Sequence, residues 1–180
     1  MGIHEGILER LRASLQAALI DNIPADDPAR AGVVILGPLQ GDPMDPDVAR
    51  ISIELYENDP DGFDEDPWSD EVEDEEYGGI EIGGALTQAR RFTLKARCLL
   101  ENTRETLSEA RAIASTVRDR LERALLKTSF KDVTAEKEYV SRGVLSQNLK
   151  SRMLQNGGPD AYDFQILIKF EVLTTRTGIT

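Results

Sequence analysis

The clearest pattern along the chain is an alternation of apolar and polar residues at residues 91–100. One side of this segment is apolar, and the other side carries Arg91, Lys95 and Arg97. A period of two residues predicts a β-strand that is buried on one face only. The single cysteine, Cys98, falls on the apolar side, so we expect it to be a small core residue and not a reactive thiol.

A long amphipathic helix follows this strand directly. Asn102 and Thr103 are residue types that cap helices, and Glu105 stands three positions after Asn102, as in a capping box. From Leu107 to about residue 127, apolar residues recur every three or four positions. The helix therefore has one apolar stripe, which only a sheet or another helix can cover.

Further elements are predicted on both sides of this strand and helix. The first is a helix at about residues 3–20, which ends before Pro24. The segments that follow are interpreted as a short strand or tethered loop at 33–36, a strand at 50–57, a strand at 139–146, a polar loop at 147–160 and a very regular strand at 162–172. We expect residues 174–180 to form a frayed tail.

These elements predict an α+β fold in a single domain that spans residues 1–180. Strands with one apolar face favour an antiparallel or mixed sheet over a parallel sheet covered on both sides. Each main helix has one apolar stripe, so we expect both helices to pack on the same face of the sheet. The opposite face is then either solvated or a subunit contact, and it would show Arg91, Lys95, Arg97, Asp163, Lys169 and Glu171.

The negative charge of the chain is concentrated in one segment. The 180 residues have a formal net charge of −12, and residues 57–76 contain twelve acidic residues and no basic one. The remainder of the chain is therefore balanced in charge. Because prolines and glycines interrupt this acidic segment, we expect a mobile loop at about residues 57–78, between two strands.

Two functional interpretations of the acidic loop stand beside that of a solvated loop. Oxygen ligands for calcium are present, at a spacing that does not match an EF-hand, in Asp59, Asp61, Asp64, Asp66 and Asp70. Alternatively, the loop is a docking arm whose apolar anchors among the charges are Phe63, Trp68 and Tyr77. Deletion of residues 61–75 tests the docking arm, which predicts that assembly with partners changes.

The sequence has none of the usual signatures of an enzyme. There is no glycine-rich phosphate loop, no metal cluster of Cys and His, and no nucleophile with a histidine partner, since His4 is the only histidine. We therefore expect neither catalysis nor a cofactor. The acidic balance argues against nucleic-acid recognition, and no apolar run approaches the length of a membrane span. A binding or structural protein is the class that is left.

The order and character of the elements resemble those of the tail terminator family of long-tailed bacteriophages. The resemblance covers residues 3–173: a short N-terminal helix, a strand at 49–55, a long polar hairpin loop, a strand at 89–97, a long helix and a closing strand at 164–172. The acidic segment and the proline-rich segment before the first of these strands are longer than the family pattern needs.

This resemblance implies a structural protein of the virion, located at the junction of tail and neck and assembled in the host cytoplasm. Its subunits would form a homo-oligomer, a hexameric ring that caps the growing tail tube and stops its polymerisation. The implied partners are the tail tube protein and a neck or head-completion protein. No cofactor, membrane or direct nucleic-acid recognition is implied.

A closed ring needs contacts between two different patches of neighbouring subunits, and a basic strand with a separate acidic loop offers complementary patches. We therefore expect the subunit or tube interface to include Arg90, Arg91, Lys95 and Arg97. The acidic loop would reach outward from the ring or into the neck, and its candidate contact residues are Phe63, Trp68, Asp64, Asp66, Asp70 and Glu71.

Two other functions are left open by the sequence. The first is another neck component, a head-closure or head-tail connector protein, which would bind the portal and not the tube. The second is a small acidic protein that masks a basic partner with residues 64–76. A monomer that binds a basic protein tightly would favour this second alternative.

Overall fold

Two long antiparallel strands form the centre of the sheet. In the computed structural model, which describes residues 3–37, 49–57, 80–82, 85–130, 139–144, 148–157 and 160–176, β4 (Ala85–Glu101) pairs with β7 (Ala161–Arg176). Their register runs from Leu86 opposite Arg176 to Glu101 opposite Ala161. The alternation predicted for both strands is confirmed, because their apolar side is buried at Phe92, Leu94, Ala96, Cys98, Leu100, Phe164, Ile166, Ile168, Phe170 and Val172.

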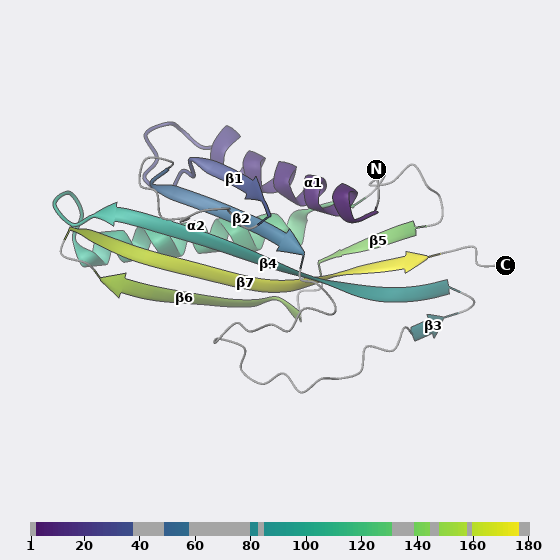
Figure 1. Ribbon diagram of the computed structural model, residues 1–180. Coiled ribbons are helices and arrows are strands. Elements are labelled where there is room, and N and C mark those ends of the chain that lie inside the picture. The colour runs from purple at the N-terminus through teal and green to yellow at the C-terminus, as the bar shows by residue number, and fades with distance from the viewer. Residues whose placement is uncertain are drawn as a thin grey trace.

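Five further strands complete a mixed sheet. Its main path is β1-β2-β4-β7-β5, with β3 beside β4 and β6 beside β7 (Figure 1). Among the described strands, only β1 and β2 run parallel, and the other pairs are antiparallel. The bounds are β1 Val33–Leu36, β2 Ile51–Glu57, β3 Ile80–Ile82, β5 Tyr139–Val144 and β6 Lys150–Gly157. The expected α+β fold with an antiparallel or mixed sheet is thus confirmed.

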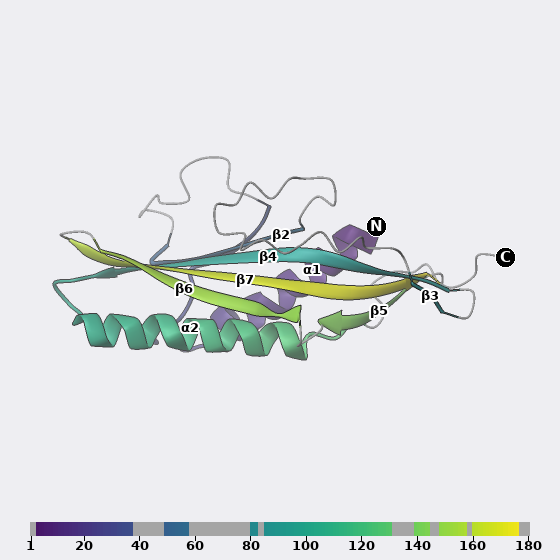
Figure 2. The same cartoon turned by 90° about the horizontal axis from the view of Figure 1, so that it is seen from below.

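Both helices contribute to one core on the same face of the sheet. The first is α1 (Ile3–Gln16), continued by the π-helical turn η1 (Ala17–Asp21), and the second is α2 (Leu107–Lys127). Figure 2 shows α2 along one face of the sheet, which is seen nearly edge-on. A single hydrophobic cluster joins the apolar face of the sheet with Ile7, Leu11, Leu15, Leu19, Ala110, Ala114, Val117, Leu121 and Leu125. The opposite face, here called the outer face, is covered by neither helix.

The start of α2 differs from the prediction. Its N-cap is Thr106 and not Asn102 or Thr103, and the capping box forms with Glu109 in place of Glu105. The Thr106 hydroxyl accepts from the Glu109 amide at 3.3 Å, and the Glu109 carboxylate accepts from the Thr106 amide at 2.8 Å. The apolar stripe also begins later than expected, since Leu107 is 45% exposed.

The segment predicted as a polar loop at residues 147–160 contains a strand, β6, which pairs with β7 from Lys150 opposite Lys169 to Gly157 opposite Tyr162. This prediction was wrong because apolar and polar residues alternate only weakly in β6. Among the described strands β6 is an edge strand, which hydrogen-bonds to β7 alone. In addition, β7 runs to Arg176, so the first residues of the expected frayed tail are paired within the sheet. Residues 177–180 lie outside the described part of the chain.

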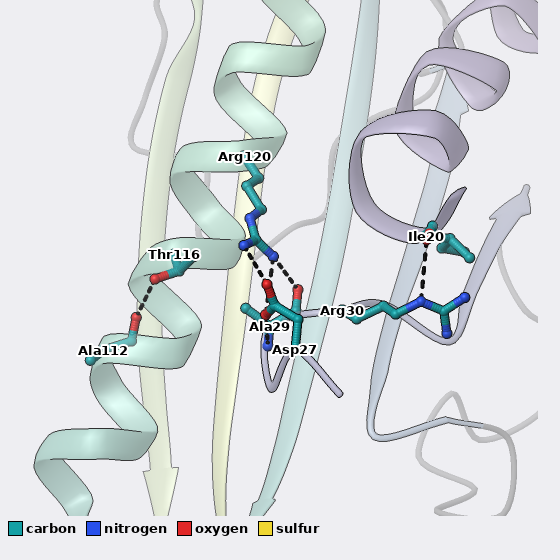
Figure 3. A network of polar contacts seen from close by, with 7 residues as sticks. All are labelled: Ile20, Asp27, Ala29, Arg30, Ala112, Thr116 and Arg120. Carbon is teal, nitrogen blue, oxygen red and sulfur yellow. Dashed lines mark hydrogen bonds and ion pairs between the residues drawn. The ribbon is translucent and has the colours of Figure 1, made fainter. Parts of the chain in front are cut away.

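A cluster of polar contacts fastens the connection between η1 and β1 to the long helix. Arg120 of α2 donates to both carboxylate oxygens of Asp27, at 3.4 and 2.8 Å, and to the carbonyl of Ala29 at 3.2 Å (Figure 3). Arg30 of the same connection donates to the carbonyl of Ile20 at 3.2 Å. These contacts fix the path along which the chain leaves α1 and enters the sheet.

Candidate subunit interface

The outer face of the sheet is built from alternate residues of four strands. The register of β2, β4, β7 and β6 places Glu54, Lys95, Leu167 and Arg152 in one row across this face. The adjacent row contains Tyr56, Thr93, Lys169 and Lys150. Arg91, Lys95 and Arg97, three of the four basic residues predicted at the interface, therefore lie together here with the predicted Asp163, Lys169 and Glu171.

Arg90, the fourth predicted basic residue, lies on the opposite face. It precedes the buried Phe92 by two residues and so shares the face that the helices cover further along the strand. Its guanidinium is 3.3 Å from the carboxylate of Glu57, and both side chains are about 14% exposed or less. Arg90 thus holds the ends of β2 and β4 together and does not belong to the outer face.

Arg97 forms a bidentate ion pair with Asp163 of the neighbouring strand β7. Its Nε and one terminal nitrogen donate to the two oxygens of Asp163 at 2.8 and 2.9 Å. Both side chains are largely buried, at 15% and 13% exposure. A bidentate pair of this kind has a fixed geometry. Arg97 therefore contributes more to the structure of the outer face than to the charge that a partner could contact.

Arg91 is more accessible, with a side chain that is 46% exposed. It stands directly opposite Glu171 and lies 3.5 Å from that carboxylate. Glu171 is itself nearly buried and also accepts from the side-chain amide of Asn148 at 2.5 Å. Glu171 therefore anchors the residues that precede β6, while the guanidinium of Arg91 reaches solvent.

Lys95 lies at the middle of the outer face, between β2 and β7. Its ammonium is 5.5 Å from the centre of the Tyr56 ring, and it stands directly opposite Glu54. Burial raises the pKa of the Glu54 carboxyl, and the nearby charge of Lys95 offsets part of that rise. Lys95 is nevertheless exposed, so its charge is available to a partner that covers this face.

The strand β6 adds basic residues that the sequence analysis did not single out. Lys150 and Arg152 are both exposed and occupy the outer face beside Lys169 of β7. Lys150 and Lys169 are directly opposite each other in the antiparallel pair. The sequence signal for these residues is the i, i+2 spacing of Lys150 and Arg152, which places them on one face only if the segment is a strand and not the predicted loop.

The other candidate contact residues lie outside the part of the chain that the structure describes. These are the acidic loop residues Phe63, Trp68, Asp64, Asp66, Asp70 and Glu71, together with the calcium-ligand candidates Asp59 and Asp61. Within the described residues, no group of three or more His, Cys, Asp or Glu side chains is arranged to hold a metal ion. None of the described helices has the length and apolar character needed to cross a membrane.

Cys98 is placed as the sequence predicted. Its side chain is fully buried on the helix-covered face, between Ala96 and Leu100 along β4. Burial raises the pKa of the thiol to about 12, with a further contribution from the negative charge of Asp163. The thiol is therefore protonated at neutral pH and behaves as a core side chain.

Comparison of the sequence with models of known protein families and with curated proteins finds no match.

Proposed function

We propose that this protein is the subunit of a ring that caps the tail tube of a long-tailed bacteriophage, ends tube polymerisation and joins the tail to the head. The observation that carries the proposal is the outer face of the sheet. Both helices pack on the other side, which leaves Arg91 and Lys95 exposed at the centre of a broad, charged surface. The order of the elements, which resembles that of the tail terminator family, supports the same function.

A sheet face with mixed charge suits the contacts of a closed ring. Each subunit of a ring presents two different patches, and charge on one patch sets the register against the other. The outer face offers a rigid patch because its residues are fixed by paired strands and by the Arg97–Asp163 ion pair. The acidic segment at residues 57–76 supplies the opposite charge within the same chain.

The test reverses the exposed charges of this face and measures assembly. The double variant Arg91→Glu, Lys95→Glu should weaken ring formation or tube binding by at least about tenfold, because like charges brought together at an interface cost several kcal/mol. The loss should be smaller at high salt, which screens exposed charges. Mass in solution and co-sedimentation with tail tubes are the measurements.

The matched control is Arg111→Glu, Arg123→Glu. It makes the same change in charge at two exposed positions of α2, on the other layer of the molecule. This variant should assemble like the unaltered chain. If Arg91→Glu, Lys95→Glu assembles normally as well, the outer face has no part in the ring.

Two alternative functions predict different partners. A head-closure or head-tail connector protein would form an oligomer but bind portal and not tube. An acidic protein that masks a basic partner would stay monomeric, and reversal of Arg91 and Lys95 would leave its binding unchanged, since residues 64–76 would make the contact.

A further inference from the structure

The strand β6 forms an edge of the sheet. Among the described strands it pairs with β7 alone, and it runs along the side of β7 that faces away from β4 (Figure 1). An edge strand has a row of backbone N–H and C=O groups that point away from its single neighbour. The hydrogen bonds of the inner strands determine which residues of β6 carry these groups.

The direction of the backbone groups alternates along β4. Directly opposite residues of an antiparallel pair are hydrogen-bonded at every second position. The amide of Leu99 donates to the carbonyl of Arg50 at 2.8 Å, so odd-numbered residues of β4 bond toward β2 and even-numbered residues bond toward β7. The amide of Asn102, which donates to the carbonyl of Asp160 at 3.4 Å, agrees with this alternation. Odd-numbered residues of β7 therefore bond toward β6.

The register of β6 with β7 then gives the outward-facing residues of β6. Odd-numbered residues of β7 stand opposite even-numbered residues of β6, as in the pair of Lys169 with Lys150. The backbone groups that point away from β7 consequently belong to Ser151, Met153 and Gln155. No described strand pairs with β6 on that side.

We propose that β6 pairs through this edge with β6 of a second copy of the chain, antiparallel and around a two-fold axis at Met153. Met153 then lies opposite Met153 of the second copy, and Ser151 lies opposite Gln155. The outward-facing residues of both copies form the hydrogen-bonded pairs of a continuous sheet. This pairing goes beyond the proposed function, because a two-fold contact uses the same edge in both copies and does not close a ring of like-oriented subunits.

The positive charges of β6 restrict how two copies can pair. Like charges directly opposite each other on neighbouring strands are destabilising. With the axis at Met153, Arg152 lies opposite Leu154 of the second copy, and Lys150 lies opposite Asn156. An axis at Arg152 would place the two arginines opposite each other. The charges therefore permit the first register and oppose the second.

The hydroxyl of Ser151 is a second, independent observation at this edge. Its oxygen is buried and has no hydrogen-bond partner within the described part of the chain. A buried hydroxyl without a partner is unfavourable. In the proposed register, Gln155 of the second copy stands opposite Ser151 on the same face, and its amide can hydrogen-bond to the hydroxyl. An axis at Leu154 would place Gly157 there, which offers no such group.

The first test places a proline at the edge. Gln155→Pro removes an N–H that points away from β7, so the fold of the single chain should be kept, which urea denaturation checks. Across the two-fold axis it removes two hydrogen bonds, and the concentration-dependent dimer should weaken by at least about tenfold in light scattering without tube protein. The control Gln155→Ala keeps the N–H and should weaken the dimer less.

The second test detects the register with disulfides. In Met153→Cys the two thiols face each other across the axis, with the Cα separation of about 5.5 Å that a disulfide can span. In Leu154→Cys they occupy diagonal positions about 7–8 Å apart, which is too far. Mild oxidation should link Met153→Cys into dimers on a non-reducing gel and leave Leu154→Cys largely unlinked. Cys98 is buried and should not react.

Three results would overturn the pairing: an unaltered chain that forms no dimer at any concentration, a Gln155→Pro variant that dimerises like Gln155→Ala, or Leu154→Cys linking as readily as Met153→Cys. The proposed function has a separate measurement. Gln155→Pro should still bind tail tubes, whereas Arg91→Glu, Lys95→Glu should lose tube binding and keep the dimer. Loss of tube binding in Gln155→Pro would assign the edge to the tube or ring contact and would also overturn the two-fold pairing.

Discussion

Asp27 is the residue through which the long helix holds the connection between η1 and β1. Its carboxylate accepts from Arg120 and also from the backbone amide of Ala29, at 2.8 Å. The hydrogen bond from Arg120 is the main cause that lowers the pKa of Asp27 below its usual value. The lowered pKa means that the ionised carboxylate stabilises the folded chain at neutral pH.

Replacement of Asp27 by Asn removes the charge and keeps the size. The free energy of unfolding should fall by about 1 kcal/mol at pH 7, a value between those of exposed and buried charged hydrogen bonds. Because the folded pKa lies below the unfolded value of about 3.9, this contribution is present above pH 4 and is lost as the pH falls through the folded pKa. Urea denaturation at pH 7 and pH 3 measures both. The control Asp26→Asn changes an exposed neighbour and should have little effect; a difference between Asp27→Asn and the unaltered chain that is no smaller at pH 3 than at pH 7 would contradict the account.

Cys98 provides a second prediction at the level of a single residue. The thiol is fully buried and its pKa is raised to about 12, so the thiolate that reacts with disulfide reagents is nearly absent at pH 8. Labelling of the folded protein should therefore be slow and should follow the opening of the sheet. Labelling in denaturant should be fast. Rapid labelling of the folded chain would show that β4 is less well covered than the structure indicates.

The capping box of α2 gives a prediction at the level of an element. The Thr106 hydroxyl accepts the amide of Glu109, and the pKa of Glu109 is lowered, first by the amide of Thr106 and then by its hydroxyl. Thr106→Ala should lower the free energy of unfolding by about 1 kcal/mol, as is usual for loss of a threonine cap. Thr103→Ala, at an exposed position in the turn before the helix, should change it by less than about 0.5 kcal/mol. Thermal or urea denaturation of the two variants shows which threonine caps the helix. A larger loss of stability for Thr103→Ala would contradict Thr106 as the N-cap and support the helix start predicted from the sequence.

How far each element could be predicted depended on how much of it is buried. The strands β4 and β7 alternate because one side of each meets the helices, and that alternation is visible in the sequence. Among the described strands β6 pairs with β7 alone, and five of its eight residues are exposed, so its sequence alternates weakly and predicts a loop. The predicted N-cap of α2 was wrong for a different reason. Asn102, Thr103 and Thr106 all have side chains that can cap a helix, and the turn after β4 determines which of them does so.

The residues of the outer face could be predicted from the sequence only in part. The two-residue period of the strand correctly places Arg91, Lys95 and Arg97 on the outer face. Arg90 is one residue out of this alternation and therefore lies on the other face. The position of Lys150 opposite Lys169 could not be predicted without the pairing of β6 with β7, because these two residues are distant in sequence. Pairing across strands depends on the whole fold, and a single sequence contains little direct signal for it.

At the scale of the whole molecule, the helix layer and the outer face of the sheet have different roles. One layer of helices supplies the core, and neither of the described helices covers the outer face of the sheet. The stacked rings of Phe92 and Phe170, with centroids 5.5 Å apart, hold β4 against β7 on the core side. A sheet face with exposed basic residues and an acidic segment in one chain are the features on which the proposed ring of identical subunits rests.

The most direct test of this account is the mass of the protein in solution, measured by light scattering at low and high salt, with and without tail tube protein. The account predicts a hexamer, six times the 19.9 kDa of one chain, either alone at low salt or when tube ends are present. Higher salt should shift the balance toward the monomer, because charges across the subunit contact are screened. A protein that is monomeric under every one of these conditions and does not bind the tube would contradict the account.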